Sequence, residues 1–167
     1  MMLGLSLSAF TTLHVIISLI AIVTGLAVMF GMLGSRPLPA LTATFLLFTI
    51  LTSVTGFLFP FTGLLLSHIF GIVSLVLLAA ACIALYGMKL KGLWRPIYLV
   101  TALLALYLNM VVLAVQGFLK VPALHALAPG NPPDGTIFLI VQGALLLFFA
   151  GLVAGILLRF RPRPLVA

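Results

Sequence analysis

The chain has almost no acidic residues. Asp134 is the one acid among 167 residues, and charged residues of both signs make up only 5% of the composition. A soluble domain carries roughly 25% charged residues, so this chain lacks the polar side chains that would cover a soluble surface. Together with 65% hydrophobic residues and a mean hydropathy of +1.46, this shortage predicts an integral membrane protein.

Cysteine and recognisable catalytic sets are equally scarce. Cys82 is the one cysteine, which excludes an intrachain disulfide and any metal motif built from several thiolates. The sequence contains no Ser/His/Asp set, no HExxH motif and no phosphate-binding loop. These absences argue against an enzyme. The lack of a cluster that mixes basic and aromatic residues argues against a nucleic-acid partner.

Long apolar runs dominate the chain instead. Five of them are long enough to cross a hydrocarbon core about 30 Å thick, which takes roughly 20 helical residues. They cover about residues 10–33, 40–59, 63–87, 96–119 and 136–160. We therefore expect an all-α integral membrane bundle of five transmembrane helices in the lipid bilayer, with residues 1–167 forming a single transmembrane domain.

The second and third runs form one nearly continuous apolar stretch, which must reverse direction once. As a single helix, residues 40–87 would be about 72 Å long at 1.5 Å per residue. The segment FPFTG lies near its middle, where Pro60 lacks an N–H group and biases Phe59 away from helical geometry. Thr62 can cap the next helix. This pattern predicts a tight turn at Pro60.

Basic residues are distributed unevenly between the two ends of the expected bundle. Seven of the eight lie at the end of the first, third or fifth run or in the segment after it, and Lys120 follows the fourth. The seven are Arg36, Lys89, Lys91, Arg95, Arg159, Arg161 and Arg163. Because basic residues accumulate on the cytoplasmic side of membrane proteins, the C-terminus is expected in the cytoplasm and the N-terminus outside.

Two histidines lie inside the runs, and their positions match. His14 and His68 each stand 21 or 22 residues before the first basic residue that follows their run. Their helices run in the same direction, so both imidazoles are expected at nearly the same depth, close to the outer interface. Gln116 reaches a similar level on the fourth helix, and Asn109 lies nearer the middle of the membrane. Polar groups in spans face the interior, so all four are candidate interior residues.

Helical spacing predicts which faces of three helices are turned inward. On the first helix the stripe is His14, Ser18, Ala21, Gly25 and Val28; on the third it is His68, Gly71, Leu75 and Ala79 or Cys82; on the fourth it is Ala102, Ala105, Asn109, Val112 and Gln116. Most of these residues are small, which suits close contact between membrane helices.

Three interpretations of the histidines stay open. A b-type haem needs two axial imidazoles at matched height, which His14 and His68 would supply. A zinc or copper ion could use His14, His68 and His125. Alternatively, the histidines form hydrogen bonds to neighbouring helices or lipid headgroups and bind nothing.

The functional expectation follows from these residues. The first candidate function is that of a non-enzymatic multi-pass membrane protein, such as an accessory or assembly subunit. The second is electron transfer by a haem held between His14 and His68. The third is the handling of a metal or of a small neutral solute. The spans carry no charge away from their ends, which argues against ion-coupled transport. Gly151 and Gly155 form a GxxxG pair, which predicts close packing within the bundle or with a membrane partner or second copy.

Several segments occur in a familiar order: LTSVTGFLFPF, SHIFGIVSL, LWRPIYLVTALLALYLN and VQGFLKVPALHALAP. Over roughly residues 10–155 the chain resembles an uncharacterised family of small multi-spanning bacterial membrane proteins. The resemblance implies a bacterial inner-membrane protein, and it implies no catalytic residue. The chain departs from that family after Pro122, where it has GNPPDG instead of polar and acidic residues.

Overall fold

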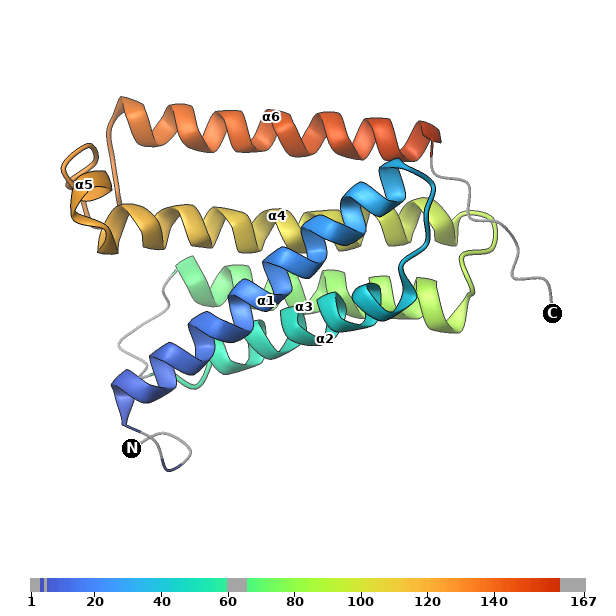
Figure 1. Cartoon of the computed structure of the whole chain (residues 1–167), viewed down its shortest axis with the longest axis horizontal. Helices are drawn as coiled ribbons and strands as arrows, with labels where there is room; N and C mark the ends of the chain where they lie inside the picture. The colour runs from blue at the N-terminus through green and yellow to red at the C-terminus, as the bar shows by residue number, and fades with distance from the viewer. Residues whose placement is uncertain (1–3, 5, 60–65, 160–167) are drawn as a thin grey trace.

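The computed structural model of the chain describes Gly4, residues 6–59 and residues 66–159, and this part is all-helical without strands. Figure 1 shows its elements as a bundle of long helices. They are α1 (Leu7–Leu33), α2 (Pro39–Gly56), α3 (Leu66–Cys82), the π-helix η1 (Ile83–Gly87), α4 (Trp94–Lys120), the short α5 (Pro122–His125) and α6 (Thr136–Arg159). The all-α architecture predicted from the sequence is confirmed.

Five helical segments of the described chain are long and apolar enough to cross a membrane, as predicted. They are Leu7–Leu33, Pro39–Gly56, His68–Gly87, Trp94–Lys120 and Thr136–Arg159. The longest two have 27 residues each, which gives about 40 Å at 1.5 Å per residue. These lengths fit a multi-pass membrane protein.

Two helix ends differ from the predicted ones for identifiable reasons. α1 begins three residues early, at Leu7, because the Ser6 hydroxyl caps it by accepting a hydrogen bond from the Ala9 N–H at 3.2 Å. α2 ends at Gly56, and a turn carries the chain through to Phe59. The predicted turn at Pro60 lies outside the described residues.

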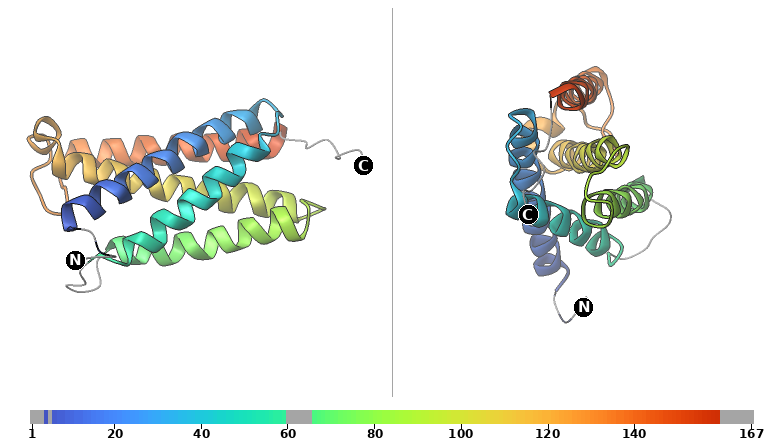
Figure 2. Two further views of the ribbon diagram at one scale, coloured as in Figure 1. Left: turned by 60° about the horizontal axis from the view of Figure 1, so that its bottom comes forward. Right: turned by 90° about the vertical axis from the view of Figure 1, so that its right-hand side faces the viewer.

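The helices are not all parallel. α1 crosses α4 and α6 obliquely, whereas α2 runs alongside α1 (Figures 1 and 2). Its C-terminal end reaches α6, where a Cβ added to Gly155 would lie 3.5 Å from Leu33. Its N-terminal end lies beside the end of α2 and well away from α4 (Figure 1). The bundle is therefore tightest near the C-terminal end of α1 and more open near its N-terminal end.

The core forms where α1, α2 and α4 cross. A Cβ added to Gly25 would lie 2.7 Å from Leu106 Cδ1 and 2.8 Å from Phe45 Cδ2, so the glycine lets three helices meet. Ala21 and Val28 on the same face of α1 are also buried, as the predicted stripe requires. Lipid tails are as apolar as leucine, so close packing at such small residues replaces the hydrophobic drive of a soluble core.

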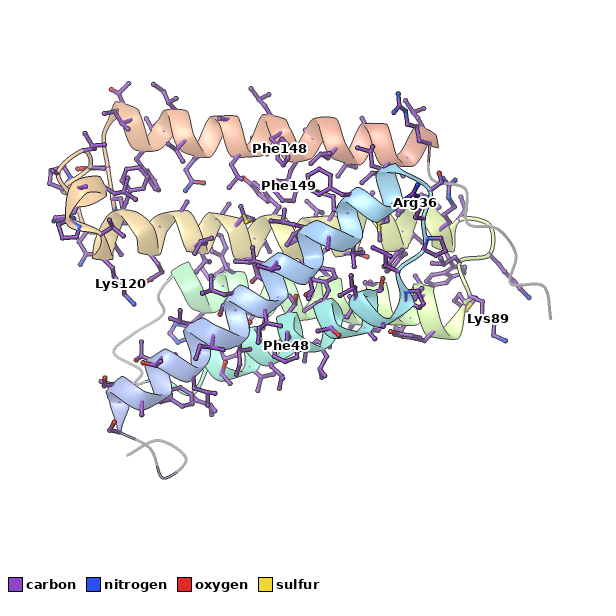
Figure 3. The ribbon with its side chains drawn as sticks, viewed as in Figure 1. Arg36, Phe48, Lys89, Lys120, Phe148 and Phe149 are labelled. Atoms are coloured by element: carbon purple, nitrogen blue, oxygen red, sulfur yellow. The ribbon has the colours of Figure 1, made fainter. Side chains whose placement is uncertain are left out.

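α6 is the least buried of the long helices. It packs on α4 through Phe149, whose ring centroid lies 5.5 Å from that of Tyr107 (Figure 3). Gly155 faces Leu33 of α1, whereas nothing lies within 4 Å of a Cβ added to Gly151. The two glycines of the GxxxG pair therefore face different surroundings, and Gly155 is used within the chain.

Two side chains cap the C-terminal end of α6. The Arg95 guanidinium donates a hydrogen bond to the Leu157 carbonyl at 3.4 Å, and the Ser35 hydroxyl donates one to the Arg159 carbonyl at 3.1 Å. The last carbonyls of a helix have no partner within it, so these bonds satisfy groups that would otherwise be left open. They also tie α6 to the turn after α1 and to the start of α4.

The basic residues occupy opposite ends of the bundle, as their spacing predicted. Figure 3 places Arg36 and Lys89 at the end where α1 finishes and Lys120 at the other. The end that holds Lys120 is also the more open one.

Replacing Gly25 by leucine tests the helix crossing. The added side chain would meet Leu106 and Phe45, so we expect the free energy of unfolding in detergent to fall by about 1–3 kcal/mol, the range for overpacked cores. Gly143→Leu is the matched control on α6, because nothing lies within 4 Å of its added Cβ. Thermal unfolding followed by circular dichroism measures both. Equal melting temperatures for the two variants would contradict the crossing.

Candidate functional site

A cavity of about 90 Å³ lies between α1, α2, α3 and α4. His14 from α1, Ser53 from α2, His68 and Ser74 from α3, and Asn109 from α4 all line it. The structure thus brings together the two span histidines and Asn109, as the helical spacing predicted. These polar groups line one partly open cavity between the helices.

The cavity lies in the half of the bundle that contains Lys120. His14 is about 10 Å from the start of α1, and Asn109 is about 16 Å from the end of α4, at 1.5 Å per helical residue. This is the open end, where α1 has moved away from α4 (Figure 1). The divergence of α1 leaves space between the helices at the level of the polar residues.

His14 has a defined hydrogen-bond partner. Its Nδ1 lies 2.7 Å from the Thr55 hydroxyl oxygen, and the hydroxyl of Thr55 donates to the Leu51 carbonyl at 2.7 Å. The Thr55 hydroxyl has one hydrogen, so when it donates that hydrogen to the Leu51 carbonyl it accepts from Nδ1 of His14. The neutral imidazole then carries its proton on Nδ1, and Nε2 remains an acceptor.

The turn after α2 places one phenyl ring against each histidine. The Phe57 ring centroid lies 5.9 Å from that of His68, and the Phe59 centroid lies 5.2 Å from that of His14. Phe57 also covers Gly71, since a Cβ added there would meet its ring at 2.9 Å. The aromatic rings therefore occupy the space that small residues near the histidines would otherwise leave open.

Two polar atoms of the cavity wall are buried without a hydrogen-bond partner: Ser74 Oγ and Asn109 Nδ2. Ser74 is only 3% exposed. Many other helical hydroxyls in the described chain donate to the carbonyl four residues earlier, as Thr49 does at 2.7 Å and Ser53 at 3.1 Å. Ser74 does not form this bond, so its hydroxyl can form a hydrogen bond with a molecule in the cavity.

Sequence reasoning missed Ser74 because it assigned the wrong continuation to the α3 stripe. After Gly71, the helical repeat allows either position 74 or position 75. The buried face follows Ser74, Leu78 and Ala81, whereas the prediction followed Leu75. Ser74 is polar and lies one turn from Gly71, which is the signal that favours it. Gln142, whose Nε2 is also buried without a partner, was missed too, but it does not line the cavity.

The prediction that Gln116 faces the interior is wrong. Gln116 is exposed and is absent from the cavity wall, which on α4 ends at Val112. The stripe up to Val112 is covered by neighbouring helices, but α1 diverges from α4 toward this end (Figure 1). Periodicity along one helix cannot show where a crossing helix stops covering it.

The three-histidine metal site is not assembled. His125 belongs to α5, and its Nδ1 lies 3.2 Å from the Phe118 carbonyl oxygen, away from the cavity wall. Among residues 6–59 and 66–159, no group of three or more His, Cys, Asp or Glu side chains is placed to hold a metal ion. Of the three histidines, only His14 and His68 line the cavity.

The cavity also does not fit a haem. Pockets for drug-sized ligands have about 300–1,000 Å³, and a porphyrin is at least that large, whereas this cavity has about 90 Å³. The ring of Phe57 covers Gly71, the small residue beside His68 that would have admitted the macrocycle. The side chains fit an occupant of a few non-hydrogen atoms.

Thr55→Val tests the assignment of the His14 proton. Valine has the shape of threonine without the hydroxyl, so the variant removes the partner of Nδ1 at a loss of about 0.6 kcal/mol, the average for such bonds in membranes. In ¹⁵N NMR spectra we expect the wild-type ring to show a protonated Nδ1, and the variant to lose this preference. Thr52→Val is the control, since its hydroxyl bonds to Phe48. Unchanged ring shifts in Thr55→Val would contradict the assignment.

Comparison with known proteins identifies no family for this chain. No protein-family model matches the chain, and searches of curated proteins and of solved structures likewise found no match. The cavity and its side chains are therefore the features from which a function can be inferred.

Proposed function

We propose that the chain is a non-enzymatic multi-pass membrane protein that binds a small uncharged polar solute in the cavity between α1, α2, α3 and α4. The observation that carries this proposal is the pair of unpartnered polar atoms, Ser74 Oγ and Asn109 Nδ2, in one cavity wall. A buried polar group without a partner costs about 1–3 kcal/mol, and the hydrocarbon core supplies no water to relieve it. An occupant that forms hydrogen bonds removes this cost.

The chemistry of the wall supports a neutral occupant. The wall offers hydroxyl, amide and imidazole groups beside phenyl and aliphatic side chains, and none of its described residues is Asp, Glu, Lys or Arg. A charged solute would therefore be buried without a counter-charge, which is strongly unfavourable. The same lack of carboxylate, thiol and amine groups supports binding without catalysis.

The size of the cavity supports a small occupant. One water needs roughly 10–15 Å³ of cavity volume, so about 90 Å³ holds several waters or one molecule of a few non-hydrogen atoms. This favours the neutral-solute function over the haem function. The accessory-subunit function stays a prediction.

For the setting of the protein we propose the bacterial inner membrane, with the N-terminus outside and the C-terminus in the cytoplasm. The separation of Arg36 and Lys89 from Lys120 (Figure 3) supports this orientation, and the resemblance to bacterial membrane proteins supports the compartment. The cavity would then open near the outer face.

A release experiment tests the proposed function. Protein purified in mild detergent is heat-denatured, and the released small molecules are quantified by mass spectrometry. We expect about one neutral compound per chain from wild-type protein, and a large loss of it from Ser74→Ala and Asn109→Leu, because each variant removes a hydrogen-bonding group of the wall. Thr24→Val is the control, since that hydroxyl bonds to Ile20 outside the cavity.

Equal release from wild-type and both cavity variants would overturn the proposal. A reduced-minus-oxidised visible spectrum of the same preparation is expected to be featureless. A haem band that disappears in His14→Ala and His68→Ala would instead support the electron-transfer function.

Reporter fusions test the orientation. An enzyme that is active only outside the cytoplasm, fused after Ala167, is expected to be inactive, because the basic end of the bundle stays inside. The same enzyme fused after Lys120 is expected to be active. The reverse pattern of activities would place the cavity near the cytoplasmic face.

A further inference from the structure

We infer that the solute is a small neutral amide-type molecule, in which a carbonyl oxygen and an N–H group lie side by side. This inference rests on the proposed function and specifies the chemical class of the ligand. It follows from which groups of the cavity wall donate hydrogen bonds and which accept them.

The donors come from α3 and α4. Asn109 Nδ2 can only donate, and it has no partner within the protein. The Ser74 hydroxyl is also unpartnered, and unlike the hydroxyls of Thr49 and Ser53 it is not engaged by its own helix. A carbonyl oxygen has two lone pairs and can accept from both side chains at once. The pair therefore selects for a strong acceptor.

The acceptor comes from α1. With the Thr55 hydroxyl donating to Leu51, Nδ1 of His14 donates to Thr55 and the imidazole keeps Nε2 as a lone pair. His14 lines the same cavity as Ser74 and Asn109. A ligand that satisfies all three side chains must therefore combine an acceptor with an N–H or O–H donor. Primary amides and ureas do this without carrying a charge.

The apolar part of the wall limits the size of the molecule. Leu108, Val112 and Phe70 also line the cavity, and Phe57 closes the space over Gly71. This surface suits a methyl or methylene group, but the volume of about 90 Å³ leaves no space for a longer chain. The shape therefore fits a compact amide.

The test compares acetamide with acetone, which has the same shape and the same carbonyl but no N–H group. Binding of each to the full chain in lipid nanodiscs is measured by saturation-transfer NMR, with Ser74→Leu as the filled-cavity blank. We expect saturable binding of both, with acetamide bound about tenfold more tightly, as one lost hydrogen bond implies.

Two variants separate the roles of the side chains. Asn109→Leu is expected to weaken both compounds, because it removes a donor to the carbonyl. His14→Phe is expected to weaken acetamide alone and to lower the acetamide-to-acetone ratio to about one. If His14→Phe does not give helical, monodisperse protein, the ratio in wild-type protein and the effect of Asn109→Leu decide the test.

The outcomes distinguish this inference from the proposed function. Equal, saturable binding of acetamide and acetone that depends on Asn109 would overturn the amide assignment and leave the solute cavity standing. A ratio that His14→Phe leaves unchanged would also overturn the assignment. If neither compound binds above the Ser74→Leu blank, the cavity holds water only, and both proposals are wrong.

Discussion

The hydrocarbon core of a bilayer offers no hydrogen-bond partner, and this constraint shapes the whole molecule. Most described hydroxyls in the spans meet it by donating to a carbonyl of their own helix, as Thr24, Thr49 and Thr101 do. His14 meets it through Thr55 on the neighbouring helix. Ser74 Oγ and Asn109 Nδ2 do not meet it within the described chain, and these two exceptions lie in one cavity wall.

The hydrocarbon core of the bilayer also determines how the helices pack. Without a hydrophobic drive between helices, close contact at small residues holds them together, and Gly25 permits the crossing of α1 with α2 and α4. α1 is oblique (Figure 2), so tight packing at one end of the bundle leaves space at the other. Phe57 and Phe59 fill part of that space against the histidines. What remains is a small cavity with a polar wall, too small for a large cofactor.

The sequence predicted most of the fold, since the length of an apolar run is a direct consequence of bilayer thickness. It also predicted that His14 and His68 lie together, because matched distances from basic helix ends imply matched depth, and helical spacing placed Asn109 on the inward face of its helix. The sequence did not predict the inward-facing residues correctly where depth and helical periodicity do not determine them. Gln116 is exposed because α1 diverges, and Ser74 was missed because a helix of 3.6 residues per turn allows two continuations of one stripe. Crossing angles and side-chain partners come from the packing of several helices at once.

The central claim is that a polar molecule completes the hydrogen bonding of the cavity. The most direct measurement is an experimental structure of the protein in lipid, at a resolution that shows individual bound molecules. We expect density in the cavity within hydrogen-bonding distance of Ser74 Oγ, Asn109 Nδ2 and His14 Nε2, with a shape larger than one water. A collapsed cavity, with Ser74 bonded to its own helix and Asn109 to a neighbouring one, would contradict the account.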